Sequence, residues 1–312
     1  MKILNAIVLI LLVGALSFGV YVMWLNFPGE SKTYKPFSAN TSDYLPKLEG
    51  FNASSKIVQF YPNMRYRDKR ISYNLGSACT TVKWDNTNRA FGILSERTVL
   101  DFYQSEGKPE IEILCSDVSP KSEEKGHFIA GEGGPSEIIN TTNFAVIFSG
   151  RISLYRDEKC DEPKIAIHEI LHSLGFDHYN STKSILYPTT GCDQQIDEEI
   201  IDIINKLYFI DSLPDLLIES ITASKTGRYL NFNITISNIG LADSDNAKLT
   251  LYSEEKKVGN FTLGNLEIGT KRILSVQNTK LPSGSDMIDF VVESDDSREL
   301  DLNNNRAELT LS

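Results

Sequence analysis

The sequence is short of positive charge. Its 312 residues hold 31 Lys and Arg against 42 Asp and Glu, a formal net charge of -11, and no basic stripe offsets this excess. An acidic chain repels phosphate backbones, which argues against nucleic acid as a partner. No internal repeat recurs at the periods of solenoid proteins, so that architecture is excluded as well.

Histidine and cysteine are scarce, at four residues each. Cys79, Cys115, Cys160 and Cys192 form an even set, which suits disulfides in an extracellular protein. Of the three ways to pair them, their order along the chain favours Cys79 with Cys115 and Cys160 with Cys192. Asn-x-Ser/Thr sequons agree weakly with an extracellular location. They begin at Asn40, Asn52, Asn140, Asn180, Asn233 and Asn260.

Long apolar runs are also scarce, with one exception at the N-terminus. Residues 6–25 form an uncharged run of 20 residues. At about 1.5 Å per residue, a helix of this length spans the roughly 30 Å hydrocarbon layer of a membrane. Tyr21 and Trp24 resemble an interfacial aromatic belt, so we expect residues 1–27 to be a transmembrane anchor. Cleavage after residues 15–17 would make them a signal peptide instead. Both alternatives place the rest of the chain across the membrane.

The full sequence is 41% hydrophobic and 23% charged, which suits two folded domains rather than disorder. Residues 28–55 are polar and rich in Ser, Pro, Lys and Asn, and predict a linker. Residues 56–212 then alternate between strand and helix patterns, which indicates an α+β domain with a twisted mixed sheet and three helices. Strands are expected at 70–75, 110–114 and 144–148, and helices at 86–96, 163–175 and 197–209.

After Pro214 the hydrophobic period changes from about 3.6 residues to 2. Short alternating segments with Gly, Asn and Asp turns predict an all-β, immunoglobulin-like sandwich over residues 213–312. The sequence Ser-Asn-Ile-Gly at 237–240 and the acidic, Asn-rich stretch at 299–305 resemble the cell-adhesion-related sandwich domains called CARDB. The resemblance implies a module that positions the preceding domain or binds a cell-surface partner.

The most informative stretch lies at 168–178, where three of the four histidines fall within eleven residues. His168 and His172 are four apart on a helix, so both imidazoles can reach one ion. Gly175 lets the chain turn back, so that His178 supplies a third nitrogen. Glu169 can then reach the open side of the metal. Three neutral nitrogen ligands on Zn²⁺ leave a position for water, which is a catalytic arrangement.

This stretch resembles the signature H-E-x-x-H-x-x-G-x-x-H of metzincin metallopeptidases. The matrixin branch fits best, because the third ligand is His178 and residues 184–188 follow at the distance of the family's Met-turn. The resemblance covers roughly 57–212 and implies a zinc endopeptidase with Glu169 as general base. Leu186 stands where the family has Met. This swap conserves volume and costs under about 1.5 kcal/mol, so we expect an intact site.

The matrixin resemblance also implies where a substrate lies. The extended peptide would follow an edge strand near residues 127–131, and residues 188–190 would form the wall of a side-chain pocket. His127 itself is expected to be an ordinary strand or loop residue. No Cys-containing segment precedes the catalytic region, so latency through a cysteine switch is not expected. Family members often bind Ca²⁺, but the chain has no twelve-residue calcium loop pattern.

Together these features predict a membrane-anchored zinc endopeptidase that hydrolyses peptide bonds of extracellular or cell-surface proteins. If residues 1–27 are cleaved, the same enzyme is secreted. Two alternatives stay open. Leu186 favours a catalytically silent relative that only binds zinc, and the C-terminal sandwich favours a surface adhesion protein.

Overall fold

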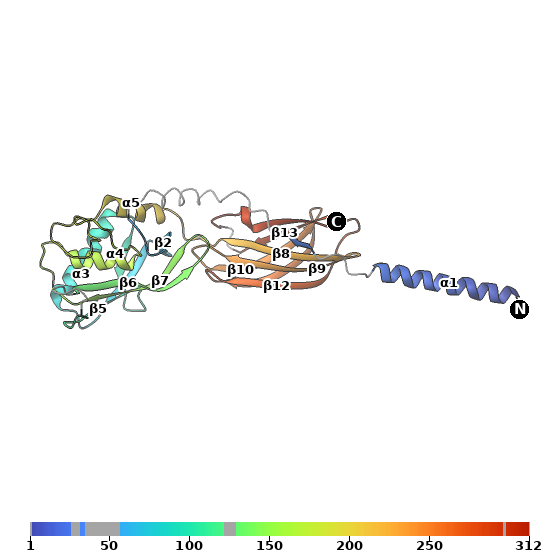
Figure 1. The fold of residues 1–312 in the computed structure, drawn as a ribbon, viewed down its shortest axis with the longest axis horizontal. Coiled ribbons are helices and arrows are strands. Elements are labelled where there is room, and N and C mark those ends of the chain that lie inside the picture. The colour runs from blue at the N-terminus through green and yellow to red at the C-terminus, as the bar shows by residue number, and fades with distance from the viewer. Residues whose placement is uncertain (1, 26–31, 35–56, 122–128, 296–297, 312) are drawn as a thin grey trace.

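The computed structural model describes residues 2–25, 32–34, 57–121, 129–295 and 298–311. Figure 1 shows an elongated molecule, in which a domain of mixed strands and helices, a β-sandwich and helix α1 (Lys2–Leu25) follow one another along the long axis. None of the helices in these parts of the chain has the length and hydropathy that crossing a membrane requires. The anchor predicted over residues 1–27 therefore finds no support in the structure.

A short strand, β1 (Lys32–Tyr34), lies within the region predicted to be a linker. It pairs antiparallel with β8 (Leu216–Thr226) of the sandwich. The chain therefore meets the C-terminal sandwich before it enters the first domain. A strand of three residues is too short for its hydrophobic period to be recognised in a sequence.

The first domain is built on a mixed sheet with the strand order β4-β3-β5-β7-β6, and β2 runs beside the start of β7. All pairings are parallel except that of β6, which runs antiparallel to β7. β7 lies inside the sheet, and both Val146 and Ile147 are buried, which confirms the interior strand that the apolar run at 144–148 predicted. The strands are β2 (Met64–Tyr66), β3 (Arg70–Leu75), β4 (Asp101–Gln104), β5 (Ile111–Cys115), β6 (Gly131–Asn140) and β7 (Ala145–Leu154).

Three helices share one apolar core with this sheet. They are α3 (Thr81–Arg97), α4 (Lys164–Ser173) and α5 (Glu198–Leu207). α3 begins before the expected start at residue 86, because the hydroxyl of Thr80 accepts a hydrogen bond from the amide of Lys83 and caps the helix. α4 is buried along its whole length. The prediction of a mixed sheet with three helices is confirmed.

The second domain is a sandwich of two four-stranded antiparallel sheets, as predicted. One sheet has the order β1-β8-β9-β12 and the other β11-β10-β13-β14. Ile234, Leu249 and Phe290 are among the alternating residues that meet in its core. The strands after β8 are β9 (Tyr229–Asn238), β10 (Ser244–Ser253), β11 (Lys256–Leu266), β12 (Lys271–Lys280), β13 (Met287–Glu293) and β14 (Arg306–Thr310).

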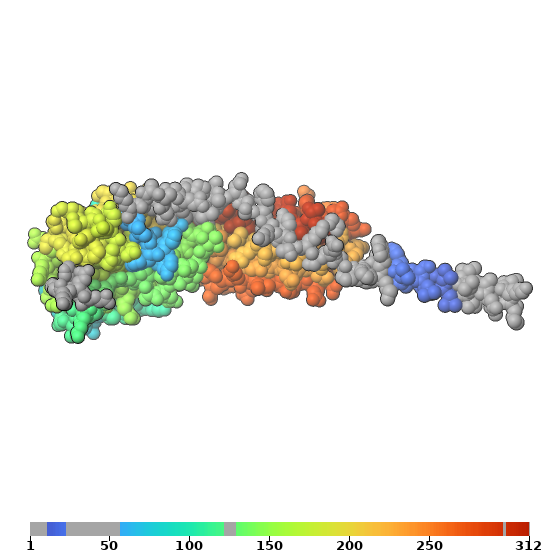
Figure 2. Space-filling view, viewed as in Figure 1, coloured from blue at the N-terminus to red at the C-terminus, as the bar shows by residue number. Residues whose placement is uncertain are grey.

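The two domains meet through an apolar interface, and Figure 2 shows them in continuous contact. Leu241 and Ile268 belong to the sandwich, yet both are buried in the core cluster of the first domain. A β-carbon at Gly269 would meet the side chain of Ile139 in β6 at 2.5 Å. The sandwich therefore packs directly against the far end of the edge strand.

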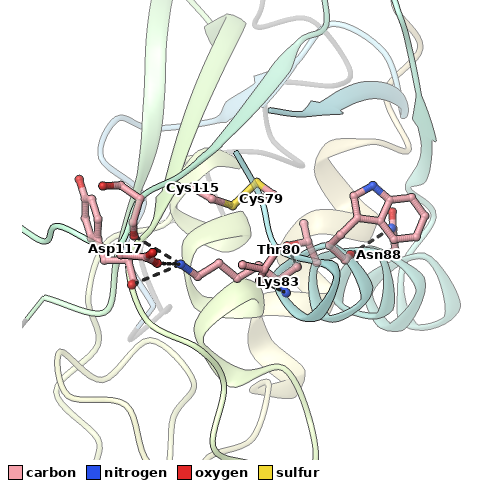
Figure 3. Close-up of a disulfide and its surroundings, with 10 residues drawn as sticks. Cys79, Thr80, Lys83, Asn88, Cys115 and Asp117 are labelled. Carbon is pink, nitrogen blue, oxygen red and sulfur yellow. Dashed lines mark hydrogen bonds and ion pairs between the residues drawn. A yellow bond between two sulfur atoms is a disulfide. The ribbon is translucent and has the colours of Figure 1, made fainter. Parts of the chain in front are cut away.

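Both predicted disulfides are present, which confirms the pairing favoured by chain order. Cys79–Cys115 ties the segment before α3 to the end of β5 (Figure 3). Cys160–Cys192 ties the loop before α4 to the segment that follows Leu186. The second disulfide thus brackets the histidine motif.

Candidate metal centre

The three histidines of the motif converge. His168 and His172 project from the same face of α4, four residues apart, and His178 approaches from the chain beyond the helix. Nε2 of His172 lies 2.9 Å from Nε2 of His168 and 3.2 Å from Nε2 of His178. The three side chains offer ligand atoms within 4.8 Å of one another, so they could hold a metal ion.

The turn that delivers His178 depends on Gly175. Its φ is +96°, a conformation that residues with a side chain resist, and an added β-carbon would meet Met64 of β2 at 2.6 Å. The amide of Phe60 also donates to the carbonyl of Gly175 at 2.9 Å, which fixes the turn against the start of the domain. Only glycine fits here, as the motif predicted.

Backbone carbonyls set the tautomers of the two helical histidines. Nδ1 of His168 donates to the carbonyl of Ile185 at 2.6 Å, and Nδ1 of His172 donates to the carbonyl of Phe176 at 2.7 Å. A carbonyl oxygen can only accept, so each Nδ1 carries the proton. Burial lowers the pKa of His168 to about 3, with the neighbouring His172 contributing, and burial also lowers the pKa of His172. Both rings are therefore neutral, with bare Nε2 atoms facing each other.

This donor set fits Zn²⁺. Neutral imidazole nitrogen is an ordinary zinc ligand, and a tetrahedral ion with bonds of about 2.0–2.1 Å separates its nitrogens by roughly 3.3 Å. The spacings of 2.9 and 3.2 Å between the Nε2 atoms are close to that separation. The hydrogen bonds from Nδ1 to backbone carbonyls also orient the rings, as they do around known zinc sites.

Glu169 lies beside the histidines and is buried, with 5% of its surface exposed. Burial raises the pKa of Glu169 to about 8, and the carboxylate of Glu132 adds to the rise. A cation held by the histidines would act in the opposite direction and favour the carboxylate form. A buried carboxyl group whose charge depends on a neighbouring cation is suited to accept and release a proton.

The edge strand β6 crosses directly over Glu169. A β-carbon at Gly131 would lie 2.7 Å from Cγ of Glu169, and one at Gly133 would lie 2.2 Å from its backbone oxygen. Glycine at both positions lets the strand approach α4 this closely. On the same strand, Glu132 accepts a hydrogen bond from the hydroxyl of Tyr155 at 2.6 Å. Gly131 closes the edge strand predicted at 127–131, whereas the sequence analysis gave no role to Glu132, Gly133 or Tyr155, although alternate glycines in a strand are a signal of close approach.

Leu186 is fully buried in the turn that supports the histidines. Its carbonyl accepts from the amide of Tyr179, and its own amide donates to the hydroxyl of Ser184. That hydroxyl donates in turn to the carboxylate of Asp197 at 2.5 Å. The turn is therefore fixed at both ends while the carbonyl of Ile185 reaches His168. A side chain of Leu serves this packing role without entering the coordination set.

The other predicted site residues have mixed outcomes. The edge strand begins at Gly131 and runs to Asn140, so it lies further along the chain than the predicted 127–131. His127 falls outside the described residues. Of the predicted pocket wall at 188–190, Thr190 lines a cavity of about 590 Å³. Within the described parts of the chain, the three histidines are the only group of three or more His, Cys, Asp or Glu side chains placed to share a metal ion.

Comparison with known families covers most of the chain. The matrixin family profile matches residues 65–209, and the CARDB profile matches residues 213–309. Karilysin from Tannerella forsythia is 28% identical over 203 residues, which is 57% of this chain and 41% of that protein. The chain thus spans less than half the length of this relative.

Two solved structures share lower similarity. A hatching-enzyme zinc-protease of Oryzias latipes is 14% identical, with 46% of this chain and 90% of that chain covered and a TM-score of 0.29. The CARDB domain of a Pyrococcus furiosus protein, solved with two metal ions, is 22% identical, with 32% and 90% covered and a TM-score of 0.26. At these TM-scores neither structure bears on the site. The two family profiles and the fold identify the chain as a matrixin domain followed by a C-terminal CARDB domain.

Proposed function

We propose that this protein is a zinc-dependent endopeptidase in which His168, His172 and His178 bind the ion and Glu169 is the general base. The observation that carries the proposal is the convergence of three imidazole nitrogens beside a buried carboxyl group, directly under an edge strand. In peptide hydrolysis the histidines would hold the ion, the carboxyl group would transfer the proton and the edge strand would bind the substrate. The matrixin family match supports the same reaction class.

The edge strand β6 would hold the substrate. It pairs only with β7 among the described strands, so its other edge offers free backbone amides and carbonyls to an extended peptide. Gly131 and Gly133 bring that edge close to Glu169. A peptide added to β6 would therefore present a backbone carbonyl beside the histidine cluster.

Glu169 would move the proton during hydrolysis. When bound, zinc lowers the pKa of a coordinated water and polarises the substrate carbonyl. Glu169 would take a proton from the attacking water and deliver it to the nitrogen of the leaving amine. Its burial keeps bulk water away from this transfer.

The decisive experiment combines metal analysis with peptide cleavage for wild type and Glu169→Gln. We expect both proteins to bind one equivalent of zinc, and the variant to cleave at least about 10²-fold more slowly. A chelator should stop the wild-type reaction. Glu255→Gln, a change in an exposed hairpin of the sandwich, is the control and should behave as wild type. Equal cleavage by Glu169→Gln and wild type would refute the role of Glu169.

A catalytically silent zinc-binding relative is the second candidate, and Leu186 is the observation in its favour. The packing around Leu186 argues against it, because the turn keeps its hydrogen bonds and the ligand nitrogens still converge. The same experiment separates the two candidates. A silent relative would bind zinc and leave every peptide of a mixed library intact.

The proposed targets are extracellular or cell-surface proteins. Two disulfides support a location outside the reducing cytosol, and the CARDB match supports a role for residues 213–312 in surface binding. Fractionation of cells that express the full chain, followed by N-terminal sequencing, would show where it resides. The same sequencing would decide whether residues 1–27 are removed.

A further inference from the structure

A cavity of about 590 Å³ opens beside the proposed catalytic residues. Its lining includes Ala130, Ile165 and Thr190. Ile165 lies one turn of α4 before His168, and Ala130 immediately precedes Gly131, which is packed on Glu169. A peptide held along β6 would therefore lie next to this cavity.

One wall of the cavity carries a buried ammonium group. Lys83, on the first turn of α3, is only 4% exposed. Its Nζ lies 3.2 Å from a carboxylate oxygen of Asp117 and 3.4 Å from the backbone oxygens of Ser116 and Tyr155. Figure 3 shows Lys83 reaching from the helix toward Asp117. All three contacts are longer than the usual charged hydrogen bond of about 2.7–2.9 Å, so none is a tight pair.

Among the charged residues that line the cavity, Lys83 is the one whose side chain is buried. Arg156, Asp157 and Lys159 are exposed. Glu158 is not paired with Lys83. One of its carboxylate oxygens accepts a hydrogen bond from the amide of Ile165 at 2.8 Å, at the start of α4. The nearest counter-charge to Lys83 is Asp117, whose side chain is 92% exposed and therefore screened by water.

Both disulfides brace this cavity. Cys79–Cys115 fixes residues 116 and 117 close to the start of α3, which holds the oxygen atoms around Lys83 in place. Cys160 and Cys192 both line the cavity and are bonded to each other. The walls therefore do not depend on loop packing alone, and the position of the ammonium group is preorganised.

We propose that Lys83 is a specificity-determining residue that selects a carboxylate side chain, Glu or Asp, at the substrate position that enters this cavity. The inference rests on the proposed peptidase function. The three acceptors of the buried ammonium lie at 3.2–3.4 Å, so exchanging one of them for a substrate carboxylate would give Lys83 a shorter charged hydrogen bond. An apolar substrate side chain would offer no such bond. The cavity is large enough for any side chain, so charge rather than size makes the choice.

The test measures kcat/KM for paired peptides that differ only by Glu or Gln at each position flanking the cleaved bond. At one position we expect wild type to prefer Glu by about tenfold or more. Lys83→Met should bring that ratio to near one. Asp117→Asn, which removes the competing carboxylate from an exposed position, should raise the ratio above wild type, and it keeps the test valid if Lys83→Met does not fold.

The outcomes separate the two hypotheses. Cleavage with no preference for Glu at any flanking position, or with equal ratios in wild type and both variants, would overturn the role of Lys83 and leave the peptidase function intact. Failure to cleave any peptide of a mixed library would reject the peptidase function itself, and the specificity with it.

Discussion

The Nε2 atoms of His168 and His172 lie 2.9 Å apart, the distance of a hydrogen bond, although neither atom carries a proton to donate. Both rings use their proton at Nδ1, where it is donated to a backbone carbonyl. Two lone pairs held face to face repel each other, and a cation between them removes the repulsion. The arrangement of these two nitrogens therefore fits a cation that both can bind.

Zinc should consequently stabilise the folded protein. At a free concentration of 100 times Kd, a ligand that binds only the native state adds about 2.7 kcal/mol to the free energy of unfolding. We expect a chelator to lower the Tm and added zinc to restore it, as measured by calorimetry. His172→Ala should remove this response. A wild-type Tm that is the same with chelator and with zinc would contradict the assignment.

Gly133 should tolerate no side chain. A β-carbon there would lie 2.2 Å from the backbone oxygen of Glu169, so Gly133→Ala forces β6 away from α4 at a cost of about 1–3 kcal/mol. The kcat/KM for peptide cleavage should fall in the same variant, because β6 would no longer lie close to Glu169. Gly134→Ala is the matched control, because no atom lies within 4 Å of its added β-carbon. The prediction fails if the two variants have the same Tm and the same kcat/KM.

The sequence predicted the parts of the site that follow from local spacing. Two histidines on one helical face, a glycine with positive φ and a third histidine after it need no knowledge of distant contacts. The edge strand β6 was misplaced for a physical reason. The sequence of β6 around Pro135 is rich in glycine and lacks the apolar alternation that is the usual sign of a strand. The strand lies close to α4 because its glycines have no side chains that would keep the two elements apart.

Two other features lay beyond any sequence pattern because they arise from tertiary contact. Lys83 lies before the helix predicted at 86–96, and its burial depends on contacts with the backbone after β5 and β7. Leu241 follows a strand of the sandwich and gave no sign that it belongs to the core of the neighbouring domain. Amphipathic periods show which residues are buried, but not against which element.

Leu186→Met should be nearly neutral. Both side chains have similar volume, and Leu186 is fully buried in the core of the first domain, so we expect a change in the free energy of unfolding below about 1.5 kcal/mol. Leu186→Ala would leave a cavity and cost about 2–5 kcal/mol. Denaturant unfolding of the three proteins gives both values. If Met at this position raised peptide cleavage strongly, Leu186 would be shown to weaken the site.

The interface between the domains should make them unfold together. Leu241 is 0% exposed, and its side chain belongs to the core of the matrixin domain although its backbone belongs to the sandwich. Leu241→Ala should cost about 2–5 kcal/mol, and the loss should extend across the interface. Ile273→Ala, on a sandwich residue that is 71% exposed, is the control and should stay within about 0.5 kcal/mol of wild type.

Hydrogen exchange followed by mass spectrometry distinguishes shared from separate unfolding. If the domains are coupled, Leu241→Ala will speed exchange in α4 as well as in β8 and β9, and calorimetry will show a single transition at lower Tm. Faster exchange confined to the sandwich, with α4 as protected as in wild type, would mean that the domains unfold independently. The sandwich could then be removed without weakening the histidine cluster, and the contact between Gly269 and Ile139 would have no part in holding β6 over Glu169.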